Sequence, residues 1–110
     1  MPELPEVETV CRSLRPFLIG KTVEKCEVKE EKLIKSSTAA EFVQDICGST
    51  FTAVNRRGKY ILLETDKGET LVVHLRMTGK LLISDKTEEV GKHTHVRFIL
   101  NDDQKELRYD

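Results

Sequence analysis

The residues at the amino terminus are of types that could do covalent chemistry. Proline follows the initiator methionine, and a small second residue is usually compatible with methionine removal. Removal would leave Pro2 with a free secondary amine, next to the carboxyl group of Glu3. An amine beside an acid suits Schiff-base chemistry on a carbonyl-like carbon. The alternative is that Pro2 and Pro5 only introduce a helix, and these residues alone favour that alternative.

Two basic segments further along the chain could bind an anion. In Arg56–Lys59 three cations surround Gly58, and a glycine lets the backbone come close to a phosphate. Basic turns are common on soluble proteins, so this segment alone is a weak indication. His74 and Arg76 project from one face of an expected strand, where an ordinary solvated face is the alternative.

Two other candidates have a competing structural explanation. Met77 follows the alternation of the apolar strand residues, so periodicity favours core packing, and only the Thr78–Gly79 turn could direct it outward. His93 and His95 share one face of an expected strand with Arg97. Such a pair could ligate a metal, but no third ligand stands at a convincing spacing. We expect phosphate contact or a plain polar face instead.

Length and composition indicate one globular domain. At 110 residues, with 38% apolar and 34% charged residues, the chain can bury a modest core and is not disordered. No apolar run approaches a membrane span and no secretory signal is apparent, so we expect a cytoplasmic protein. A net charge of −1 leaves only local basic patches to attract nucleic acid. Cys11, Cys26 and Cys47 are expected to be reduced and buried.

The periodicity predicts a mainly β fold with two helices. The first helix begins at Pro5, presents an apolar stripe at three-to-four spacing, and ends before Gly20, sooner if Pro16 interrupts it. A second, short helix is expected over 39–46, closed by Gly48. About eight short strands indicate an antiparallel β-sandwich with the first helix packed against it. Strands are expected at 21–30, 50–57, 59–65, 70–77, 81–84, 93–100 and 106–109.

Five segments form a recognisable series along the chain. They are MPELPEVET at 1–9, RRGKY at 56–60, HLRMTG at 74–79, KHTHV at 92–96 and ELRY at 106–109. In this order they resemble the bacterial formamidopyrimidine-DNA glycosylases, which excise oxidised purines such as 8-oxoguanine. The related endonuclease VIII branch, which acts on oxidised pyrimidines, typically has glycine in place of Leu4 and lacks the HLRMTG pattern.

The resemblance implies a catalytic site at the amino terminus. Pro2, freed of Met1, would attack the sugar C1′ of the damaged nucleotide and displace the base. The resulting iminium has no N–H proton to lose, so it remains an electron sink and favours β-elimination of the 3′ phosphate. Glu3 matches the family's proton donor, Lys59 a proton donor in elimination that could also bind phosphate, and Glu6 an active-site carboxylate. If Met1 remains, Pro2 is an amide and cannot attack.

The resemblance also implies a set of DNA-binding residues. His93 matches a DNA-contacting histidine, and His74 with Arg76 would grip the backbone flanking the lesion. Met77 matches the wedge that fills the gap left by a flipped-out nucleotide, in conflict with its alternation. The implied partner is damaged double-stranded DNA, bound by a monomer.

Residues 1–110 are therefore expected to form an N-terminal catalytic domain. The family continues with an arginine–phenylalanine stretch, a helical domain with a helix–two-turn–helix, and a four-cysteine zinc finger, none of which is in this sequence. No cofactor is expected here, since zinc belongs to that finger. By family the protein would be a glycosylase and AP lyase, with weak or no activity of this chain alone. The alternatives are a non-enzymatic sandwich that binds nucleic acid or protein, and an oxidised-pyrimidine glycosylase.

Overall fold

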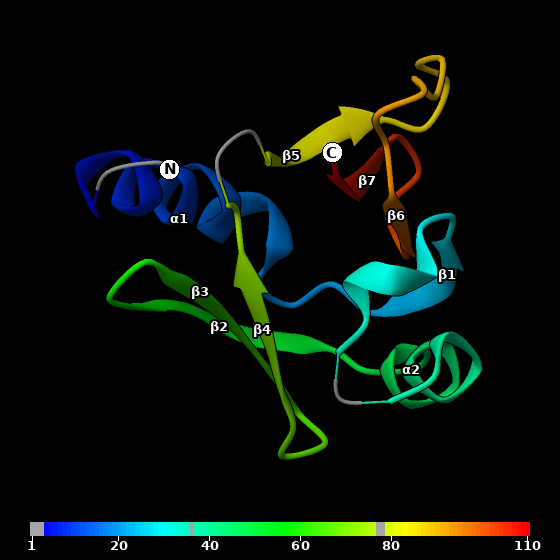
Figure 1. Ribbon diagram of the computed structural model, residues 1–110, viewed down its shortest axis with the longest axis horizontal. Coiled ribbons are helices and arrows are strands. Elements are labelled where there is room, and N and C mark those ends of the chain that lie inside the picture. The colour runs from blue at the N-terminus through cyan, green and yellow to red at the C-terminus, as the bar shows by residue number, and fades with distance from the viewer. Residues whose placement is uncertain (1–3, 36, 77–78) are drawn as a thin grey trace.

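Two antiparallel sheets form the body of the computed structural model, which describes residues 4–35, 37–76 and 79–110 (Figure 1). One sheet has the strand order β1-β6-β7-β5 and the other has the order β2-β3-β4. The expected β-sandwich with two α-helices is confirmed, with seven strands among the described residues. The strands are β1 (Val23–Val28), β2 (Phe51–Arg57), β3 (Tyr60–Thr65), β4 (Thr70–His74), β5 (Leu81–Asp85), β6 (Val96–Leu100) and β7 (Lys105–Tyr109).

The first helix, α1 (Leu4–Leu18), packs against β2, β3 and β5. It continues past Pro16, so the prediction that this proline ends the helix early is wrong. A proline in a helix removes one backbone hydrogen bond, but Pro16 lies on the exposed face and Leu18 in the next turn is fully buried. Burial of the last turn therefore outweighs the local cost. The predicted apolar stripe is buried at Val7, Cys11, Leu14 and Leu18.

The second helix, α2 (Ala39–Ile46), has the predicted bounds and packs against β1. A capping box begins it: the Glu41 N–H donates to Thr38 Oγ1, and the Thr38 N–H donates to Glu41 Oε1, both at 3.1 Å. These bonds satisfy backbone donors that a helix start leaves free. Gly48 follows with φ of +83°, a conformation that favours glycine. A short 3₁₀ helix, η1 (Glu31–Leu33), precedes α2 and is absent from the sequence-based expectation.

Strand β1 explains why Val23 breaks the alternation seen in the sequence. Its pairing with β6 shifts register between Val23 and Lys25, as in a β-bulge. The extra residue returns both Val23 and Cys26 to the buried side. The three cysteines are free, with Cys11 and Cys26 buried and Cys47 partly buried. Among the described residues, no helix is long and apolar enough to cross a bilayer.

Strands β1, β4 and β6 are each shorter than predicted by three or more residues. β4 ends at His74, because Arg76 adopts a left-handed conformation with φ of 59°. β6 begins at Val96, which leaves His93 in a turn, so the prediction of His93 and His95 on one strand face is wrong. The inward–outward alternation nevertheless extends past both strand ends, since Leu75 and Thr94 are buried. At these two ends the alternation of buried and exposed side chains therefore continues beyond the residues that pair in a sheet.

Candidate functional site

The turn that presents Lys59 is tied to the start of helix α1. Arg56 donates from Nη1 to the carbonyl of Gly58 at 3.0 Å and from Nε to Glu8 Oε2 at 3.0 Å. Gly58 takes φ of +60°, as a tight β2–β3 turn requires. On the same helix, Arg15 donates to the Val54 carbonyl at 2.8 Å. One guanidinium thus connects the Lys59 turn with the helix that follows residues 1–3.

The charge of Glu8 is stabilised by three arginines. Its pKa is lowered first by the hydrogen bond from Arg56, against the opposing effect of desolvation, and further by the charges of Arg15 and Arg12. Because the folded-state pKa is depressed, this stabilisation is present above the ordinary carboxyl pKa. It is lost as pH falls through the folded-state value.

Replacing Arg56 by glutamine is expected to raise the pKa of Glu8 most of the way back to its ordinary value. The matched variant Arg12→Gln should move it much less, because the Arg12–Glu8 distance is 4.0 Å and the Arg12 side chain is 76% exposed. Carbon-detected NMR titration of the glutamate carboxyl groups measures both shifts. Equal shifts in the two variants would contradict the assignment of Arg56 as the main partner.

His74 lies at the same end of the three-stranded sheet. It pairs with Tyr60 across β3 and β4, and the two ring centroids are 5.0 Å apart. The backbone N–H of Arg76 donates to His74 Nδ1 at 3.2 Å. In a neutral imidazole one nitrogen accepts and the other donates, so this bond places the proton on Nε2. A groove of about 500 Å³ has Tyr60, His74 and Arg76 in its lining.

Arg76 is the one described non-glycine residue with positive φ. Such a conformation costs about 1–3 kcal/mol and persists where neighbouring contacts determine it. Here the neighbours are the His74 ring nitrogen, the buried Leu75 side chain, and the Gly79 N–H, which donates to the Leu75 carbonyl at 2.7 Å. The strand-end turn therefore fixes the backbone of Arg76, whose cationic side chain is exposed.

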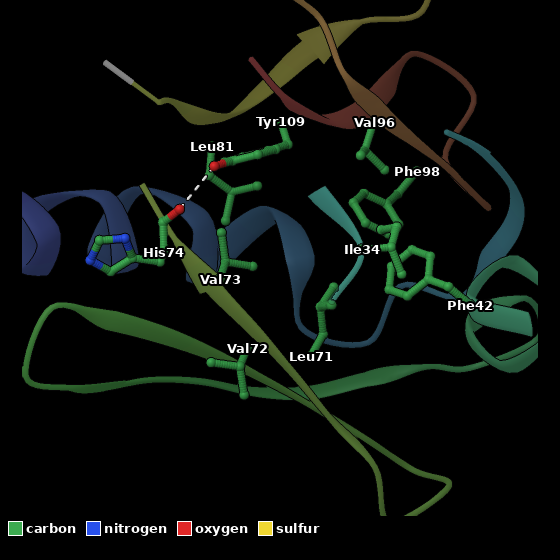
Figure 2. A pocket seen from close by; sticks show the side chains of 10 residues that line it. All are labelled: Ile34, Phe42, Leu71, Val72, Val73, His74, Leu81, Val96, Phe98 and Tyr109. Carbon is green, nitrogen blue, oxygen red and sulfur yellow. Dashed lines mark hydrogen bonds between the residues drawn. The ribbon is translucent and has the colours of Figure 1, made fainter. Parts of the chain in front are cut away.

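A small apolar pocket of about 90 Å³ lies between the sheets beside β4 (Figure 2). Figure 2 shows the His74 ring turned away from the pocket, while its backbone oxygen faces Tyr109. The Tyr109 hydroxyl donates to that oxygen at 2.8 Å. Burial raises the pKa of Tyr109, against a smaller lowering by Arg76, so the hydroxyl stays protonated. The pocket itself is lined mainly by aliphatic and phenylalanine side chains and offers no reactive group.

His93 lies in an exposed turn next to the end of β7. The neighbouring Thr94 donates its hydroxyl to Asp110 Oδ1 at 2.8 Å, and the His95 N–H donates to the Tyr109 carbonyl at 2.8 Å. The His95 and Tyr109 rings lie 6.4 Å apart. Residues 109 and 110 thus connect the segment around His93 with the one around His74.

The structure brings some of the predicted site residues together. The Lys59 turn, His74 and Arg76 share one end of the three-stranded sheet, and His93 is linked to them through Tyr109. Glu6 is exposed in the first turn of α1. Pro2, Glu3 and Met77 lie outside the described residues. Within the described part of the chain, no three His, Cys, Asp or Glu side chains form a group that could hold a metal ion.

Three contributors were missed by the sequence reasoning. Tyr60 and Tyr109 have no role in the sequence-based prediction, and Glu8 is expected there only to favour the positive end of the first helix, not to bind Arg56. The partner of Tyr60 could have been found, because a hairpin centred on Lys67 places residue 60 opposite residue 74. The contacts of Glu8 and Tyr109 join segments far apart in sequence, and no local pattern indicates them.

A comparison with protein families decides what the chain is related to. The model of the formamidopyrimidine-DNA glycosylase N-terminal domain matches residues 1–110. The chain belongs to this family. A glycosylase of this name from Carboxydothermus hydrogenoformans is 50% identical over 102 residues, which cover 93% of this chain and 39% of the relative. The Exiguobacterium relative is 48% identical over 110 residues, covering 100% of this chain and 39% of the relative.

Solved structures of the family share the fold. The Lactococcus lactis glycosylase in complex with DNA containing FAPY-dG aligns with a TM-score of 0.90 at 31% identity, over 97% of this chain and 39% of that one. The same enzyme bound to DNA with an AP site aligns with a TM-score of 0.90 at 30% identity, over 98% of this chain and 40% of that one. The chain thus spans about 39% of the length of the curated relatives it matches.

Proposed function

We propose that this chain is the nucleophile-bearing domain of a DNA glycosylase and AP lyase that removes oxidised purines from duplex DNA. The observation that supports this best is the family match over residues 1–110. The geometry adds support, because Arg56 joins the Lys59 turn to the helix that follows Pro2 and Glu3. A nucleophile and a proton donor from distant segments need such a connection to act on one sugar.

The proposed reaction begins at the amino terminus, once Met1 has been removed. The Pro2 nitrogen bonds to C1′ as the glycosidic bond breaks, and the departing base takes the bond's electron pair and a proton. Glu3 supplies a proton for base departure or for opening of the sugar ring. The amine then loses its proton, and its lone pair expels O4′ from C1′. O4′ takes up a proton, the sugar ring opens, and C1′ is left as an iminium. Removal of a C2′ proton expels the 3′ phosphate, with Lys59 as proton donor, and water finally hydrolyses the iminium to regenerate the amine.

The proposed DNA contacts use the end of the three-stranded sheet that carries His74 and Arg76, together with the turn around His93. The exposed Arg76 and His93, with His74, would contact phosphates flanking the lesion. Met77 is proposed as the wedge that occupies the space left by the flipped nucleotide. Phosphate contacts fix the position of the protein on the duplex, and the reaction at C1′ depends on that position.

The test is borohydride trapping of the 110-residue chain, with removal of Met1 verified by intact mass. On a duplex with an abasic site we expect a covalent adduct that forms more slowly than with a full-length relative. The proposed site offers few cationic side chains, Lys59 and Arg76 among them, and duplex affinity depends strongly on the number of phosphates that are neutralised. Absence of any adduct at high protein concentration would exclude a nucleophile role of Pro2 in the 110-residue chain alone. A rate equal to that of the full-length relative on 8-oxoguanine DNA would refute the expected weakness.

Two comparisons separate the alternatives. Thymine glycol duplex should compete poorly with 8-oxoguanine duplex, whereas the reverse order would place the protein with the pyrimidine-specific branch. For a purely binding module, Pro2→Gly would leave DNA association unchanged and no adduct would form with either protein. For the proposed enzyme, the substitution slows adduct formation while association remains.

A further inference from the structure

One side chain holds the end of β4 from the opposite sheet. In the β3–β4 hairpin the Thr65 N–H bonds to the Glu69 carbonyl. The alternation of an antiparallel ladder therefore turns the His74 carbonyl toward the free edge of β4. A partly buried carbonyl needs a partner, and the Tyr109 hydroxyl provides it at 2.8 Å (Figure 2).

The position of Tyr109 is itself fixed on both sides of β7. The His95 N–H bonds to the Tyr109 carbonyl at 2.8 Å. Asp110 exchanges two backbone hydrogen bonds with Lys80, at 2.8 and 3.0 Å. Tyr109 is also paired with Val96 and Leu81 in the four-stranded sheet. The Tyr109 hydroxyl therefore reaches His74 from a stretch of backbone that can move only if hydrogen bonds of the four-stranded sheet break.

The turn from His74 to Arg76, called here the His74–Arg76 corner, is closed by a hydrogen bond of its own. The Arg76 N–H donates to His74 Nδ1, and this geometry needs a fixed orientation of the two peptide groups between His74 and Arg76. The first of these, between His74 and Leu75, carries the oxygen that accepts from the Tyr109 hydroxyl. While the ring is neutral, occupation of Nδ1 as an acceptor leaves Nε2 as the only donor.

We propose that Tyr109 is a positioning residue: by holding the His74 carbonyl it keeps the His74–Arg76 corner closed, so that His74 presents Nε2–H to an anionic oxygen of the ligand. The identification of the ligand as a DNA phosphate rests on the proposed function, whereas the closed corner and the tautomer of His74 rest on the geometry alone. A hydrogen bond from a fixed donor loses less freedom on binding than one from a rotating ring. Tyr109 acts through His74 and does not touch the ligand.

The first test concerns the corner without DNA. At about pH 8, where an ordinary histidine is neutral, nitrogen NMR should show His74 protonated at Nε2. In Tyr109→Phe, the Arg76 amide hydrogen should exchange about three- to tenfold faster, the effect of losing one ordinary hydrogen bond. Tyr60→Phe removes the other tyrosine hydroxyl and should leave that exchange unchanged. An Nδ1-protonated ring, or equal exchange in wild type and Tyr109→Phe, would overturn the proposal.

The second test uses a short duplex at low salt. The amide nitrogen of Gln mimics Nε2 of histidine, whereas that of Asn mimics Nδ1, so His74→Gln should bind several-fold more tightly than His74→Asn. Tyr109→Phe should weaken wild-type binding about three- to tenfold while leaving the His74→Asn variant unaffected. Equal affinities of the Gln and Asn variants would overturn the proposal. If the wild-type chain binds no duplex, the proposed function of this chain fails, and the corner is judged by the NMR results alone.

Discussion

Replacement of Glu106 by glutamine is expected to lower the free energy of unfolding by about 3 to 5 kcal/mol, the usual cost of breaking a buried ion pair. Glu106 is fully buried in β7. Arg97 donates to both of its oxygens, at 2.7 and 2.8 Å, and Arg108 donates to Oε2 at 2.8 Å. Loss of the carboxylate would leave the buried Arg108 guanidinium without its counter-charge.

The same cluster holds the segment before His93. Arg108 donates to the carbonyls of Glu88, Glu89 and Asp85, at 2.7, 3.4 and 3.3 Å. The guanidinium thus joins β7 to residues 85–89. We therefore expect faster amide exchange in this segment when Glu106 is replaced, in addition to the lower global stability.

A matched control separates buried from exposed charge. Glu27 also accepts from Arg97, at 2.7 Å, but its side chain is 43% exposed. Glu27→Gln should therefore cost less than about 1 kcal/mol. Urea unfolding of wild type and both variants measures the difference, and equal losses in the two variants would contradict the role given to Glu106.

The stability lost in the Glu106 variant should depend on pH. Burial acts to raise the pKa of Glu106, but the hydrogen bonds from Arg97 and Arg108 lower it below the ordinary value. A depressed folded-state pKa stabilises the protein above the ordinary carboxyl pKa, and this contribution is lost as pH falls through the folded-state value. The difference between wild type and Glu106→Gln should hence be full at neutral pH and shrink below about pH 4. A difference independent of pH would show that packing rather than charge is responsible.

A chain extended at its amino terminus is expected to form no borohydride-stable adduct with abasic DNA. Any residue placed before Pro2, including a retained Met1, converts the secondary amine into an amide, whose nitrogen lone pair is delocalised and not nucleophilic. The expected loss is complete, because no other step of the proposed reaction can begin. Denaturing gels of the trapped complex and intact mass of the protein measure it.

The control for this experiment is the stability of the fold, measured by urea unfolding. The first described helical residue, Leu4, is 43% exposed, so an added residue or two before Pro2 should leave the urea midpoint unchanged. Pro2→Gly offers an intermediate case: it keeps a terminal amine but forms an imine that can become neutral, so trapping should persist at a lower rate. An adduct of undiminished rate with the extended chain would assign the nucleophile to another residue, such as Lys59.

The elements of this fold were largely predictable because its local patterns are strong. The three-to-four spacing in α1, the short helix over 39–46 and the alternation of residues 70–76 are each confirmed. The errors fall where a tertiary contact opposes a local preference. Pro16 is tolerated because Leu18 is buried beyond it, and β4 stops because Arg76 turns into a left-handed conformation. Propensity describes a segment alone, and packing acts on it from outside.

The amino-acid sequence by itself determined the family and the reactive residues proposed for it, since covalent chemistry depends on residue type and the motifs stand in a fixed order. Only the tertiary structure decided how those segments are joined. It placed Arg56 between the Lys59 turn and Glu8, and Tyr109 against the backbone of His74. Hydrogen bonds between residues 48 or 35 positions apart leave no periodic trace in the sequence. They form only when the core has brought the helix and the two sheets together.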